Sequence, residues 1–120
     1  MCIRDSARID RTQLQGLLER GAVVLVEALG PMYFDDAHLP GAINIPLDRI
    51  DELAPLLLPD REAMIVVYCS DRTCQTSEMA SRRLEALGYR WVFEYADGKQ
   101  DWIEHGLPVE RAGEPADGGG

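Results

Sequence analysis

The stretch Ala63-Met-Ile-Val-Val-Tyr-Cys-Ser-Asp-Arg-Thr-Cys-Gln-Thr-Ser77 decides the fold. Residues 63–68 are an unbroken apolar run with β-branched members, which predicts a strand buried on both faces. Residues 69–76 are polar and have the length of a tight loop. From Ser77 onward, apolar residues recur at i, i+4 and i+7, which predicts a helix. These apolar residues are Ala80, Leu84 and Leu87.

Cys69 follows this strand, at a position that favours a reactive thiol. In an open parallel sheet, ligands bind beyond the carboxyl ends of the strands. The helix after the loop directs unpaired N–H groups toward the loop and favours an anion there, and such a field lowers the pKa of a thiol. Arg72 adds a positive charge to the loop and Asp71 opposes it. Cys69 is therefore the candidate nucleophile, and the alternative is a small, inert core cysteine.

Length and composition indicate one globular domain. The chain has 120 residues, 46% hydrophobic and 28% charged, which is enough for a single core. The formal net charge of -9 argues against nucleic acid and anionic membranes as partners. No apolar run approaches the ~20 residues of a membrane span. The N-terminus lacks the apolar core of a signal peptide, so we expect a cytoplasmic protein.

The three cysteines do not supply the four ligands of a zinc site, and we expect neither a metal nor another cofactor. In a reducing compartment, unpaired cysteines are either inert or reactive. The spacing Cys69-x4-Cys74 places a second thiol in the same loop.

Helices and strands alternate along the rest of the chain. Asp10 and Gln13 form a capping-box pattern that opens a helix, and Gly21 ends it. Pro55 is expected to end a short helix near Ala54. Further strands are predicted at 22–26, 42–45 and 91–95, and a last short helix is predicted from Asp97. This alternation is typical of a parallel α/β sheet with helices on both faces.

The predicted domain covers residues 10–110. Residues 1–9 show no periodicity and are expected to be a flexible segment. Residues 111–120 are rich in Gly, Pro and acidic residues without core residues, and are expected to be a disordered tail.

Several segments, in their joint order and spacing, resemble the signatures of rhodanese-like domains. The segments are His38-Leu-Pro-Gly-Ala-Ile-Asn-Ile-Pro, Ile65-Val-Val-Tyr-Cys69, Leu87-Gly-Tyr-Arg-Trp-Val, Tyr95-Ala-Asp-Gly, Trp102 and Gly106-Leu-Pro-Val109. The resemblance implies a five-stranded parallel sheet with helices on both faces. It also implies sulfane-sulfur transfer through a persulfide on Cys69, held by backbone N–H groups of the loop. The implied loop residues are Ser70, Asp71, Arg72, Thr73, Gln75 and Thr76.

The sequence departs from the family pattern at two places. The common loop, Cys-x-x-Gly-x-Arg-Ser, is replaced by one with Arg72 and Cys74, as in a variant subgroup with Cys-x4-Cys. Glu27 stands where the family has Asp after the first strand. We expect Glu27 to be a hydrogen-bond anchor near the site, and His38 to belong to a structural turn.

The resemblance implies a small sulfurtransferase. The Cys69 thiolate would take sulfur from thiosulfate or another persulfide, and cyanide, a thiol or a sulfur-relay protein would accept it. Cys74 either resolves or protects the persulfide, or is a half-buried loop residue. The alternative function is a non-catalytic or redox-sensing module that uses both cysteines. Cysteine phosphatases and arsenate reductases form a third class, but phosphatases need Cys-x5-Arg, and Gln75 stands at that position.

Overall fold

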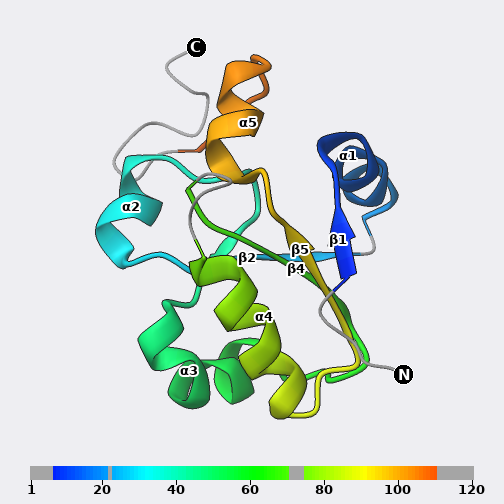
Figure 1. Cartoon of the computed structure of the whole chain (residues 1–120), viewed down its shortest axis with the longest axis vertical. Helices are drawn as coiled ribbons and strands as arrows, with labels where there is room; N and C mark the ends of the chain where they lie inside the picture. The colour runs from blue at the N-terminus through cyan, green and yellow to red at the C-terminus, as the bar shows by residue number, and fades with distance from the viewer. Residues whose placement is uncertain (1–6, 22, 71–74, 111–120) are drawn as a thin grey trace.

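Five parallel strands form one sheet at the centre of the computed structural model, which describes residues 7–21, 23–70 and 75–110 (Figure 1). The strand order is β1-β5-β4-β2-β3, and every neighbouring pair is parallel. This is the predicted five-stranded parallel sheet. The strands are β1 (Ala7–Ile9), β2 (Val24–Glu27), β3 (Ile43–Asn44), β4 (Met64–Tyr68) and β5 (Trp91–Tyr95).

β4 lies at the middle of the sheet and is buried on both faces, as its apolar run predicts. Ile65 and Val67 enter the core beneath α3 (Ile50–Leu57) and α4 (Thr76–Ala86). Val66 and Tyr68 enter a second core, beneath α1 (Arg11–Arg20) and α5 (Gly98–Glu104). Figure 1 shows these two pairs of helices on opposite sides of the strands. The sheet is thus the middle layer of three.

The predicted start and end of α1 are confirmed. The Asp10 side chain accepts a hydrogen bond from the Gln13 N–H at 2.8 Å, and the Gln13 side chain accepts one from the Asp10 N–H at 2.9 Å. Gly21 ends the helix in the left-handed region with φ 68°. A side chain at that φ would be strained, so glycine suits this position.

The N-terminal boundary of the domain differs from the expectation. Ala7–Ile9 forms β1 and pairs with β5, whereas the lack of periodicity in residues 1–9 predicts a flexible segment. Three residues show too little alternation to be recognised as a strand. The partner of β1 also lies far away in sequence, so no local pattern reveals the pairing. Residues 1–6 and 111–120 lie outside the described part of the chain.

The helix expected to end near Ala54 instead runs through Pro55, and it follows a short 3-10 helix, η1 (Leu47–Arg49). Proline in a helix interior removes one hydrogen bond and crowds the preceding turn. Here the packing overrides this cost. Ile50, Ala54 and Leu58 recur at i, i+4 and i+8, and all three are buried against the sheet.

The connection after β2 contains a short helix, α2 (Pro31–Asp36), with proline at its first turn, where the missing N–H costs nothing. Asp97 stands at the N-cap of α5, but its side chain makes no capping hydrogen bond. Among the described residues, none of the helices has both the length and the apolar character needed to span a membrane.

Candidate functional site

Cys69 directly follows β4 and is buried, with 1% of its surface exposed. Two backbone N–H groups of α5 hold the chain at this point. The Lys99 N–H donates to the Cys69 carbonyl at 2.9 Å, and the Gln100 N–H donates to the Ser70 carbonyl at 2.7 Å. Four of the predicted loop residues, namely Asp71, Arg72, Thr73 and Cys74, lie outside the described residues, so their roles stay predictions. The beginning of the loop is thus fixed by α5.

The remaining predicted loop residues lie on either side of this gap. Ser70 is half-buried, Gln75 is exposed at the N-cap position of α4, and Thr76 is the first residue of that helix. Ser77, the next residue, is completely buried. The chain therefore enters α4 within a short distance in sequence of Cys69, as the strand–loop–helix pattern predicts.

The Cys69 thiol lies against Ser77, and Ser77 lies against a buried carboxylate. The Cys69 Sγ is 3.5 Å from the Ser77 Oγ, and the Ser77 hydroxyl donates to the Glu94 Oε2 at 2.7 Å. Glu94 is 4% exposed, and its Oε1 accepts from the Arg8 Nε at 3.3 Å. Sequence reasoning missed Glu94, because an acidic residue inside a short strand resembles a solvent-facing position.

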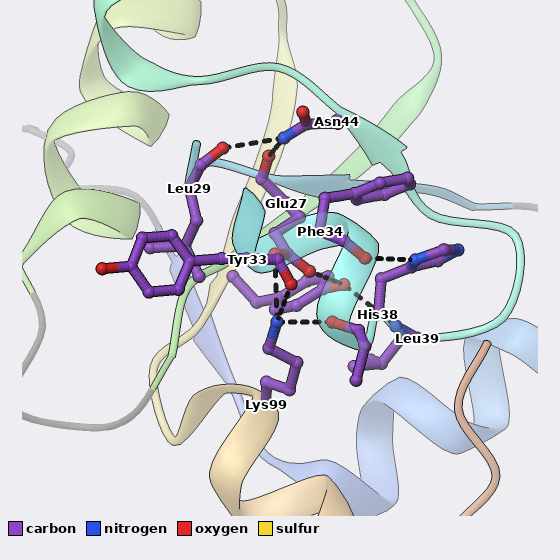
Figure 2. Close-up of polar contacts among 10 residues, drawn as sticks. Glu27, Leu29, Tyr33, Phe34, His38, Leu39, Asn44 and Lys99 are labelled. Carbon is purple, nitrogen blue, oxygen red and sulfur yellow. Dashed lines mark hydrogen bonds and ion pairs between the residues drawn. The ribbon is translucent and has the colours of Figure 1, made fainter. Parts of the chain in front are cut away.

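Glu27 anchors a second buried network on the other face of the sheet (Figure 2). Its carboxylate is completely buried and accepts hydrogen bonds from the Tyr68 hydroxyl at 2.7 Å and from the Lys99 Nζ at 3.1 Å. The Tyr68 oxygen in turn accepts from the Leu39 N–H at 3.0 Å. Burial, and then the charge of Glu27, raise the pKa of Tyr68, so this hydroxyl remains a donor. These contacts are those of a hydrogen-bond anchor.

Lys99 connects that network to the backbone of Cys69. Besides Glu27, its ammonium group donates to the Tyr33 carbonyl at 2.9 Å, as Figure 2 shows, and it also donates to the Ala37 carbonyl. Its own N–H holds the Cys69 carbonyl. One residue therefore links α5, α2, β2 and the end of β4. Sequence reasoning missed Lys99 as well, since a lysine in the first turn of a short helix carries no signal of burial.

Both ring nitrogens and the ring face of His38 contact other residues. Its Nδ1 lies 2.8 Å from the Phe34 carbonyl oxygen, and its Nε2 lies 3.3 Å from Glu110. The ring stacks on Phe34 with centroids 3.7 Å apart. Backbone hydrogen bonds also join His38 and Glu110 in an isolated bridge. These contacts connect α2, the turn after it and the C-terminal segment, which is what a structural role requires.

The described residues contain no group of three or more His, Cys, Asp or Glu side chains that could hold a metal ion. Two buried carboxylates, Glu27 and Glu94, each have protein donors. They point to opposite faces of the sheet, since Glu27 contacts Tyr68 and Glu94 contacts Ser77 of α4. The arrangement suits a buried nucleophile supported from both sides.

The comparisons with known proteins agree with this geometry. A family model described as the rhodanese-like domain matches residues 10–105. A sulfurtransferase of Allochromatium vinosum is 30% identical over 95 residues, which cover 79% of this chain and 85% of that protein. A solved structure described as rhodanese with anions from E. coli superimposes with a TM-score of 0.64 and 30% identity, covering 76% of this chain and 100% of that chain.

Other relatives are longer proteins. An HTH-type transcriptional regulator of Mycobacterium tuberculosis is 35% identical over 102 residues, which cover 85% of this chain and 44% of the regulator. An adenylyltransferase and sulfurtransferase of Ogataea parapolymorpha is 30% identical over 103 residues, which cover 83% of this chain and 26% of that protein. The chain thus spans less than half of the length of these two relatives.

Proposed function

The chain belongs to the rhodanese-like domain family, and on that basis we propose that it is a sulfurtransferase that carries sulfane sulfur as a persulfide on Cys69. The observation that carries the proposal is the position of Cys69. It is buried at the carboxyl end of the central strand, its carbonyl is held by α5, and its sulfur lies against the first turn of α4. A nucleophile in such a position is shielded from water and oriented by rigid elements.

The reaction proceeds in two half-reactions. The Cys69 thiolate attacks the outer sulfur of thiosulfate, a new S–S bond forms, the S–S bond of thiosulfate breaks, and sulfite leaves with the electron pair. Cyanide or a thiolate then attacks the outer sulfur of the persulfide, and Cys69 leaves as a thiolate. We assign stabilisation of the persulfide anion to backbone N–H groups of residues 70–76.

The acceptor in the cell is proposed to be a thiol, including one on a sulfur-relay protein. The relative from Ogataea parapolymorpha is named both adenylyltransferase and sulfurtransferase, which supports a place for such domains beside a second activity. A reducing compartment such as the cytoplasm would keep the thiol available.

A sensing module is the second candidate function. It is favoured by the match to a protein named as a transcriptional regulator, which this chain resembles over 102 residues. In that case Cys69 and Cys74 would cycle between dithiol and disulfide, and sulfur turnover would be absent.

Intact-mass spectrometry after incubation with thiosulfate tests the proposal. The reduced wild-type protein is expected to gain one sulfur atom, Cys74→Ser is expected to gain it as well, and Cys69→Ser is not. Addition of cyanide should remove the sulfur and release thiocyanate. If the wild type gains no sulfur but readily forms a Cys69–Cys74 disulfide under mild oxidation, the sulfurtransferase proposal is wrong and the sensing module takes its place.

A further inference from the structure

Three groups that are almost completely buried form a continuous path from the nucleophile to a carboxylate. The thiol of Cys69 meets the hydroxyl of Ser77 at 3.5 Å, and that hydroxyl meets Glu94 at 2.7 Å. Their exposed fractions are 1%, 0% and 4%. A serine hydroxyl donates one hydrogen bond while it accepts another. In this arrangement Ser77 accepts from the thiol and donates to the carboxylate.

Electrostatic repulsion limits how many groups between Cys69 and Glu94 can carry a negative charge at the same time. If Cys69 and Glu94 were both ionised, two negative charges would share a buried site with only one hydroxyl group between them. Like charges in such a position strongly disfavour double ionisation. Glu94 faces Arg8 across the β1–β5 register and has the apolar Val67 beside it on β4. Arg8 is 65% exposed, so water screens its charge.

We propose that Cys69 and Glu94 share one proton through Ser77, which makes Ser77 a catalytic residue and Glu94 the positioning residue behind it. The inference rests on the proposed function, in which Cys69 is the nucleophile. When the thiolate forms, the thiol proton passes to the Ser77 oxygen as the Ser77 proton passes to the Glu94 Oε2. The products are a thiolate, an unchanged serine and a neutral carboxylic acid. The net charge of the path therefore stays constant.

The same path serves the second half-reaction in reverse. When the acceptor removes the outer sulfur, Cys69 leaves as a thiolate in a buried position. The proton held on Glu94 then returns through Ser77 and restores the thiol and the carboxylate. Arg8 binds the other carboxylate oxygen, Oε1, at 3.3 Å and so keeps Oε2 directed at Ser77.

The test is the pH dependence of Cys69 alkylation by iodoacetamide, followed at the Cys69 peptide by mass spectrometry in the Cys74→Ser background. A shared proton predicts two inflections in the wild-type rate, separated by a flat region in which the thiolate fraction does not change with pH. Glu94→Gln and Ser77→Ala each break the path. Both are expected to show one inflection, with the rate falling about tenfold per pH unit below it. Glu62→Gln removes the same charge from an exposed ion pair before β4 and should keep the wild-type profile.

A wild-type profile with a single inflection, unchanged in shape by Glu94→Gln or by Ser77→Ala, would overturn the proposal. The role of Glu94 would then be limited to holding α4 on the sheet through its hydrogen bond with Ser77. Glutamine has the size of glutamate and still accepts from Ser77, so this variant is the one expected to fold normally. Alkylation needs no sulfur donor. If thiosulfate adds no sulfur to the wild type while the two inflections are present, sulfur transfer fails and the shared proton stands.

Discussion

Replacing Lys99 by methionine tests whether its buried ion pair with Glu27 holds α5 on the body of the domain. The ammonium group of Lys99 contacts Glu27 at 3.1 Å, and their side chains are 10% and 0% exposed. In Lys99→Met the carboxylate keeps the Tyr68 hydroxyl but loses the ammonium group, and the carbonyls of Tyr33 and Ala37 lose a donor. Methionine retains most of the apolar stem, so the change acts mainly on the charge.

The expected loss of stability is large. Removing one partner of a buried ion pair costs about 3–5 kcal/mol, out of a total of about 5–15 kcal/mol for a domain of ordinary stability. We therefore expect Lys99→Met to lower the free energy of unfolding by about 4 kcal/mol. The double variant Glu27→Gln/Lys99→Met removes both charges. It should be more stable than the sum of the single variants predicts, by about 1–3 kcal/mol.

Urea unfolding, followed by the fluorescence of the buried Trp102, measures these free energies. Arg90→Met is the matched control, because it breaks a pair with Glu62 in which both side chains are more than half exposed, and little change is expected. The reasoning would be refuted by a loss below about 1 kcal/mol in Lys99→Met, or by strict additivity in the double variant.

Two further changes test the packing of other helices. The first change is at Asp101 of α5. Burial raises the pKa of this carboxyl group, but hydrogen bonds from Tyr95 and Arg11 outweigh burial and lower the pKa below 3.8. The stability that this carboxylate contributes is present above pH 3.8 and is lost as the pH falls through the lowered pKa of the folded protein. In acid, the urea midpoint should therefore fall more steeply for the wild type than for Asp101→Asn. Parallel curves for the two proteins would contradict this. Pro55→Ala restores an N–H to α3 and should stabilise the protein by about 1–2 kcal/mol in thermal unfolding, and a lower melting temperature would show that the proline is accommodated without cost.

Local patterns predicted the parts of the fold that depend on neighbours in sequence. The apolar run before Cys69 predicts a strand buried on both faces, and the spacing of apolar residues after Ser77 predicts a helix; the structure has both. The capping box of Asp10 and Gln13 is a contact between residues three apart, so it is visible in the sequence. The place of Cys69 at the end of the central strand followed from the same signals.

The features that were missed depend on residues far apart in the chain. Lys99 and Glu27 are 72 positions apart, and their burial follows only once α5 lies over the end of β2. Glu94 reaches Ser77 because α4 packs on β5, and neither residue type predicts that contact. Pro55 predicts the end of a helix, but the burial of Ala54 and Leu58 outweighs the cost of the proline. Tertiary packing decided each of these cases.

The pairing of β1 with β5 has a consequence for protein synthesis. Of the five strands described in this sheet, β1 is made first, but the residues that bond to it, such as Glu94 opposite Arg8, follow 86 positions later. On the ribosome, Ala7–Ile9 therefore has no partner until nearly the whole domain has emerged. Closing so long a loop is slow compared with local helix formation. The last step of folding is expected to be the return of the N-terminal strand, which completes the sheet and delivers the arginine that binds Glu94.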